Sequence, residues 1–153
     1  AQALREMVDL QMRRGDTVSA NTLCDRYLAL HPDDPVMLFR KASLLGQRNE
    51  ELPRALSLIE RALQLDAKPE YGVLRGLLRV ASRDYAQGIQ DLEPAARDGK
   101  ASGLVDAALA EAYAATGDAR TARKWLDSAT EKSQNGDSVS VARLNAVRNM
   151  LGK

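Results

Sequence analysis

Apolar residues recur along most of the chain at spacings of three and four, which is the spacing of one face of an α-helix. Clear cases are Leu4, Met7, Val8 and Met12, and later Leu104, Ala107, Ala108 and Leu109. No long stretch alternates apolar and polar residues with the period of two that a half-buried strand shows. The pattern therefore predicts an all-α protein built from amphipathic helices.

Turn-forming residues divide these helices at regular intervals. Gly15-Asp16 and Gly117-Asp118 mark two turns, and the run from His31 to Pro35 marks another. The second helix of each pair contains a small residue, and these residues recur about every 34 positions. They are Ala20, Ala55, Gly88 and Ala122. The spacing indicates four tandem helix pairs.

The four pairs resemble the tetratricopeptide repeat (TPR) family, whose unit is a helix-turn-helix of about 34 residues with a defined scatter of large and small residues. The matching positions are Leu4, Val8, Gly15, Asp16, Ala20 and Pro32 in the first unit and Leu109, Tyr113, Gly117, Asp118, Ala122 and Leu126 in the fourth. The resemblance implies an α-solenoid, a right-handed superhelical stack of antiparallel helix pairs. We expect a single domain over residues 1–153, with repeats at about 1–34, 35–68, 69–100 and 101–134.

The last part of the chain carries another apolar stripe, with arginines on its other side. Its members are Val139, Val141, Leu144, Val147 and either Met150 or Leu151. A solenoid exposes the apolar face of its last repeat, and a terminal helix with one polar side commonly covers that face. We expect residues from about 137 to 151 to form a capping helix; the alternative is that the chain continues in the full protein.

Composition narrows the classes of partner. The 22 Lys and Arg residues nearly balance the 21 Asp and Glu residues, which disfavours nucleic acid as a partner. The longest apolar runs fall far short of the roughly 18 to 20 residues that span a bilayer, so we expect no direct membrane insertion. Cys24 is the only cysteine, which excludes an internal disulfide and a cysteine-based metal cluster. Its core-facing position predicts an inert thiol.

Catalytic motifs are missing from the sequence. His31 is the only histidine, and it lies in a turn without a nucleophile or a carboxylate pair beside it. No glycine-rich phosphate loop is present. We therefore expect neither enzymatic activity nor a metal or cofactor.

In the TPR family, the first helix of each pair lines a concave groove from which ligand-binding side chains project. By that resemblance, the expected partner-binding residues are Arg5, Asp9, Phe39, Arg40, Ser43, Val73, Arg79, Ala107 and Glu111. Arg75, Arg79 and Arg83 recur every four residues and predict either a solvated face or a clamp for a carboxylate. The lining suits an amphipathic helix or an extended peptide.

The expected function is that of a non-catalytic scaffold or adaptor that holds a peptide or helix of a partner protein in this groove. The Ala/Leu/Arg-rich composition suggests a bacterial protein, soluble in the periplasm or cytoplasm, that assists assembly of a multiprotein or envelope/secretion complex. Two alternatives stay open: a docking or regulatory region of a larger enzyme such as a glycosyltransferase, and a self-association module that forms a homodimer. The start at Ala1 without a signal sequence fits a trimmed or excised chain.

Overall fold

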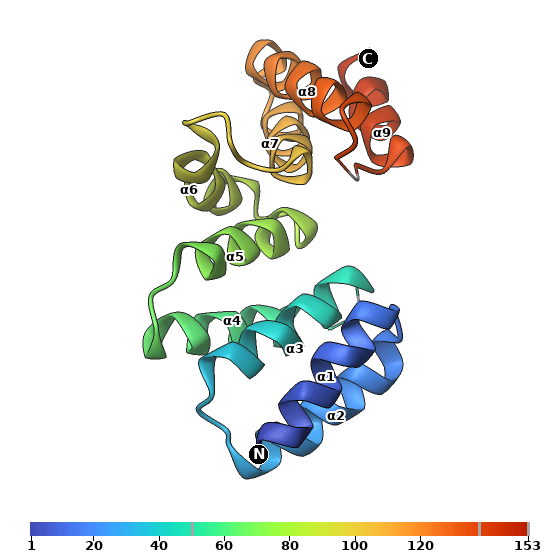
Figure 1. The fold of residues 1–153 in the computed structure, drawn as a ribbon. Helices are drawn as coiled ribbons and strands as arrows, with labels where there is room; N and C mark the ends of the chain where they lie inside the picture. Colours follow the sequence, from blue (N-terminus) through green and yellow to red (C-terminus); the bar gives the residue numbers. More distant parts are fainter. Residues whose placement is uncertain (50, 138, 153) are drawn as a thin grey trace. The chain divides into compact units, whose positions relative to one another are not determined.

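The computed structural model describes residues 1–49, 51–137 and 139–152, and in these ranges it contains helices and no strands (Figure 1). The helices are α1 (Gln2–Arg14), α2 (Thr17–Leu30), α3 (Pro35–Gln47), α4 (Leu52–Leu65), α5 (Pro69–Ala81), α6 (Tyr85–Ala96), α7 (Gly103–Ala115), α8 (Ala119–Gln134) and α9 (Val141–Leu151). The prediction of an all-α fold is confirmed. Glu50 in the expected second repeat, Ser138 in the expected cap and Lys153 lie outside the described residues.

Aspartates in the predicted turns fix where several helices begin. The carboxylate of Asp16 accepts a hydrogen bond from the Ser19 amide at 3.0 Å, and that of Asp118 accepts one from the Thr121 amide at the same distance. These bonds satisfy backbone donors that the first helical turn leaves without a partner. Gly15 ends α1 with φ of 74°, a left-handed conformation that glycine adopts without steric cost.

The chain divides into two compact units, Ala1–Leu74 and Arg75–Lys153. Each expected repeat segment contains two helices, from α1 and α2 in residues 1–34 to α7 and α8 in residues 101–134. The boundary between the units falls within α5, and the organisation as one domain of four repeats stays a prediction.

The first unit contains α1 to α4 and the beginning of α5. Its α1 lies beside α2, α2 packs against α3, and α3 packs against α4 (Figure 1). One apolar cluster joins the first three helices, and its buried members are Val8, Ala20, Leu23, Cys24, Tyr27, Met37 and Leu44. The burial of Cys24 in this cluster confirms its predicted core position.

The second unit contains the rest of α5 together with α6 to α9. Gly88 of α6 shows why the second helix of a repeat needs a small residue. A Cβ at this position would lie 2.7 Å from Cγ2 of Val80 and 3.3 Å from the Gly76 carbonyl oxygen. Side chains larger than hydrogen would therefore force α5 and α6 apart. The small residue predicted at this position of the repeat is thus explained by close helix packing.

The terminal helix α9 packs against both α7 and α8. Leu144 and Val147 are buried, as the stripe predicted, and they join Val139 in a cluster with apolar residues of α7 and α8. The prediction is wrong for Val141, which is 65% exposed. Of the two alternatives at the end of the stripe, Leu151 packs against the cluster, whereas Met150 is 40% exposed. Only one narrow side of α9 is therefore in contact with the core of the unit.

Candidate partner-binding site

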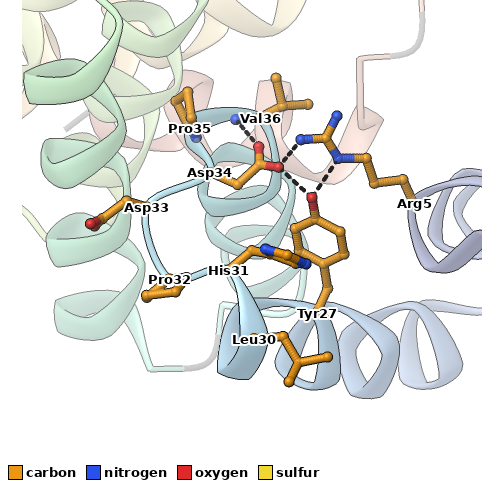
Figure 2. A pocket seen from close by; sticks show the side chains of 9 residues that line it. All are labelled: Arg5, Tyr27, Leu30, His31, Pro32, Asp33, Asp34, Pro35 and Val36. Atoms are coloured by element: carbon orange, nitrogen blue, oxygen red, sulfur yellow. Dashed lines mark hydrogen bonds and ion pairs between the residues drawn. The ribbon is translucent and has the colours of Figure 1, made fainter. Parts of the chain in front are cut away.

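A shallow hollow of about 580 Å³ opens on the first unit where α1, the end of α2 and the beginning of α3 meet (Figure 2). We call it the loop hollow because all four residues of the α2–α3 loop, from His31 to Asp34, line it. It is lined by Arg5, Tyr27, Leu30, His31, Pro32, Asp33, Asp34, Pro35 and Val36. Leu30 is 70% exposed and gives the hollow an apolar edge.

Asp34 organises the loop hollow. The guanidinium of Arg5 and the hydroxyl of Tyr27 both donate to its Oδ2 atom, the latter over 2.8 Å. Arg5 Nε also donates to the Tyr27 hydroxyl oxygen at 2.8 Å, so the three side chains form a closed triangle (Figure 2). The other carboxylate oxygen of Asp34 accepts the amides of Val36 and Met37 and caps α3. These bonds fix the loop between α2 and α3.

The triangle keeps its charges near neutral pH. Burial works to raise the pKa of Asp34, but hydrogen bonds from Tyr27, Arg5 and the Met37 amide outweigh it and lower the pKa below its ordinary value. Hydrogen bonding to Asp34 raises the pKa of Arg5, while burial and Asp34 raise that of Tyr27. The arrangement is that of a structural ion pair, because all three shifts favour the protonation states that exist at pH 7.

A second hollow of about 550 Å³ adjoins the first and shares Arg5, Tyr27 and Val36 with it. We call it the helix hollow because it lies between α1 and α3. Its full lining is Ala1, Gln2, Arg5, Glu6, Asp9, Tyr27, Val36 and Arg40. Arg40 and Asp9 form an ion pair across it at 2.6 Å. Three of the residues expected from the sequence, Arg5, Asp9 and Arg40, therefore lie together.

The other expected residues of the first unit lie outside both hollows. Phe39 stacks on Tyr71, with ring centroids 4.9 Å apart and planes 26° from parallel. Ser43 on α3 and Val73 on α5 are half-buried. Phe39 contributes to packing within the unit, because an aromatic pair of this geometry is stabilising beyond the area it buries.

The arginine stripe of α5 is occupied by a carboxylate of the chain itself. Arg75 binds Asp91 of α6 through two nitrogens, at 2.6 and 2.9 Å, and Arg79 binds the same carboxylate at 2.8 Å. The side chains of Arg75 and Arg79 are only 29% and 17% exposed, so a fully solvated face is the wrong description for them. Arg83 follows the end of α5 with φ of 65° and is exposed. The carboxylate that Arg75 and Arg79 hold thus belongs to α6, and the role of Arg79 in binding a partner stays a prediction.

Two further expected residues belong to α7. Ala107 has no exposed surface and packs in the cluster with Leu126 and Val147, so its expected role in contacting a partner is wrong. Glu111 is half-buried and accepts a hydrogen bond from Arg143 of α9 at 3.0 Å. The helix α9 thus binds a side chain that the sequence predicted to face a partner.

Sequence reasoning missed Tyr27 and Asp34 as members of the site. The Asp34-Pro35 pair does carry a signal, since aspartate before proline is typical of a helix start. Tyr27 carries none, because its spacing only places it on the apolar face of α2, where a tyrosine hydroxyl can meet any partner.

The described residues contain no group of three His, Cys, Asp or Glu side chains that could hold a metal ion. Burial raises the pKa of the Cys24 thiol to about 11, which suppresses its reactive thiolate form. No helix in the described part of the chain has the length and apolar character to cross a membrane.

Comparison with known proteins gives matches of structure only. No protein-family model matches the chain, and no curated protein does. A mutant O-GlcNAc transferase of Thermobaculum terrenum matches over 85% of this chain and 26% of its own length, with TM-score 0.70 and 26% identity. A tetratricopeptide repeat protein of Parabacteroides merdae matches over 98% and 58%, with TM-score 0.72 and 20% identity. MamA of Desulfovibrio magneticus matches over 99% and 86%, with TM-score 0.72 and 14% identity.

Proposed function

We propose that the chain, which has the fold of a tetratricopeptide-type helical repeat protein, acts as a non-catalytic scaffold that holds a peptide segment of a partner protein. The loop hollow and the helix hollow of the first unit are the proposed contact surface. Repeat folds of this kind provide extended surfaces rather than deep catalytic pockets. The organisms of the matching structures fit a bacterial origin, and assembly of a bacterial multiprotein complex is the setting that we propose.

The observation that carries the proposal is the continuity of the two hollows. They adjoin at Arg5, Tyr27 and Val36, and together they run from the α2–α3 loop to the middle of α1 and α3. Leu30 and Val36 offer apolar surface, while the Asp9–Arg40 pair offers both signs of charge. A short segment with one apolar anchor and polar flanks would fit this lining, since apolar anchors supply most of the affinity in such contacts.

The experiment is selection of peptides from a random displayed library on the immobilised chain, followed by calorimetric affinity measurement. Leu30→Lys places a charge on the apolar edge of the loop hollow at a side chain that is 70% exposed, so folding is not disturbed. Val141→Lys is the matched control, because Val141 is 65% exposed and lies on α9, outside both hollows.

We expect selected peptides to lose about tenfold or more in affinity with Leu30→Lys, which corresponds to about 1.4 kcal/mol. Val141→Lys should bind as the unchanged chain does. Equal affinity for all three proteins, or equal loss in both variants, would contradict the assignment of the first-unit hollows.

A second candidate function is a docking or regulatory region of a larger glycosyltransferase. It is favoured by the match to the O-GlcNAc transferase, of which this chain spans about a quarter. Immunoblotting of the native protein in its source cells is the direct test. A mass several times that of 153 residues, with sugar transfer in the immunoprecipitate, would support this candidate, and a native mass near 16.7 kDa would exclude it.

A further inference from the structure

A separate hollow of about 370 Å³ lies on the second unit between α6 and α8. Its lining is Glu93 from α6 and Thr121, Lys124, Trp125 and Ser128 from α8. We call it the Trp125 hollow. Its volume is near the lower end of the range of about 300–1,000 Å³ that is usual for ligand pockets, so it is suited to one long side chain.

The hydroxyl groups that line this hollow, those of Ser128 and Thr121, form hydrogen bonds to carboxylates of the chain itself. Ser128 donates its hydroxyl hydrogen to Oδ2 of Asp106 at 2.6 Å, because an ionised carboxylate can only accept. Asp106 is fully buried, and the Lys132 ammonium pairs with the same oxygen at 2.6 Å. The backbone amide of Thr121 and, to a smaller extent, its side chain bond to the Asp118 carboxylate and lower the pKa of Asp118. Toward a ligand, both hydroxyl oxygens therefore present lone pairs.

Glu93 adds a carboxylate to these acceptors. It accepts the hydroxyl of Tyr113 on α7, and burial together with Glu93 raises the pKa of Tyr113 to about 12. Tyr113 thus stays a neutral donor at physiological pH and holds the carboxylate in place without cancelling its charge. Three neighbouring groups of the hollow are acceptors, so a ligand rich in donors is favoured.

Trp125 supplies the wall that makes this ligand class more specific. Its side chain is half-buried, so one part packs in the unit while another lines the hollow. Tryptophan is the most favourable aromatic partner of a cation. A planar guanidinium combines several donors with a face that stacks on an indole, whereas an ammonium offers only a point charge. Lys124 also lines the hollow and is exposed, and its charge opposes a cation.

We propose that the Trp125 hollow binds an arginine side chain of a partner protein. The guanidinium lies against the indole of Trp125 and donates to Glu93 and Ser128. This contact is independent of the peptide surface on the first unit, and either can exist without the other.

Trp125 is the only tryptophan of the chain, so its fluorescence reports directly on this hollow. The probes are blocked tripeptides Gly-X-Gly with X as arginine, lysine, glutamate or citrulline, the neutral isostere of arginine. We expect a saturable change with the arginine probe, with a Kd of about 1 mM because one side chain supplies little contact. Citrulline should bind at least about tenfold more weakly, and lysine should fall between the two.

Three variants test the assigned roles. Glu93→Gln removes the negative charge and should weaken arginine binding about fivefold or more, whereas Lys124→Ala removes the opposing charge and should strengthen it. Tyr113→Phe keeps the Glu93 carboxylate but removes the hydrogen bond that positions it. It should therefore weaken arginine binding less than Glu93→Gln does, which separates loss of charge from loss of positioning. Far-ultraviolet circular dichroism checks that each variant is folded.

Four outcomes of these binding measurements would overturn the proposal. It is overturned if the arginine probe gives no saturation, if citrulline binds as well, or if Glu93→Gln has no effect while remaining folded. It is also overturned if the glutamate probe binds and Lys124→Ala abolishes that binding, because the hollow would then be an anion site.

Discussion

Lys41 of α3 is charged and almost fully buried, and replacing it separates the contribution of its stem from that of its charge. Its side chain is 1% exposed, and its ammonium donates to Asp25 Oδ2 at 2.7 Å. Asp25 is 48% exposed and also pairs with Arg54 at 3.4 Å. The carboxylate is therefore partly solvated, while the aliphatic stem of Lys41 fills the space between α2 and α3.

The aliphatic stem and the charge of Lys41 predict opposite orders of stability for two substitutions. Lys41→Ala removes the stem and leaves a cavity, which should lower the free energy of unfolding by about 2–4 kcal/mol. Lys41→Met keeps a similar apolar volume and removes the charge, and replacing a buried ion by a packed apolar group is often neutral. We expect Lys41→Met to lie within about 1 kcal/mol of the unchanged chain.

Urea unfolding at pH 7, followed by circular dichroism, measures all three proteins. Asp25→Asn should cost about 1–3 kcal/mol in the normal background, because it leaves the buried ammonium without its carboxylate. In the Lys41→Met background the same substitution should cost almost nothing. If Lys41→Met is as unstable as Lys41→Ala, the ion pair and not the stem dominates, and the reasoning fails.

Three further predictions follow from single sites. Asp34→Asn should lower stability by about 1–3 kcal/mol at pH 7; because the folded pKa of Asp34 is lowered, its contribution is full above about pH 5 and is lost as pH falls, so urea unfolding from pH 7 to pH 3 should show a shallower acid loss in this variant. Gly88→Ala places a Cβ 2.7 Å from Val80 and should cost about 1–3 kcal/mol in thermal unfolding. In the control Gly72→Ala, the added Cβ meets nothing within 4 Å, so the free energy of unfolding should rise by about 0.5–1 kcal/mol. Cys24 should react with a disulfide reagent at pH 8 only at the rate of unfolding, and fast labelling of the folded chain would contradict its burial.

The sequence predicted the helices and their turns because those features are local. Apolar spacing identifies a helix, and glycine or aspartate in the turn identifies its ends, as Gly15 and Asp118 illustrate. Small residues were also informative, since Ala20 and Ala122 are fully buried at equivalent positions of two repeats. Such signals need no knowledge of what lies across the interface.

Side-chain partners could not be predicted in the same way. The pattern placed Arg79 either on a solvated face or in a partner-binding groove. Only the packing of α5 on α6 brings Asp91, twelve positions later, within 2.8 Å of it. Ala107 failed for a related reason: a small apolar residue suits a groove and a core equally, and the packing of α8 and α9 decides between them. Lys41 lies at an apolar position of its repeat, and its burial depends on Asp25 of another helix.

The internal pairing of the charges constrains how a partner can bind. A carboxylate that approaches Arg40 must compete with Asp9, already held at 2.6 Å, and exchanging one exposed carboxylate for another contributes little free energy. Affinity at the first unit must therefore come from covering Leu30 and Val36, with the charges setting orientation. Glu93 differs, because its described hydrogen bond comes from a neutral tyrosine hydroxyl. A guanidinium can reach that carboxylate without displacing the tyrosine, so the second unit is where a charged contact can add affinity rather than only direction.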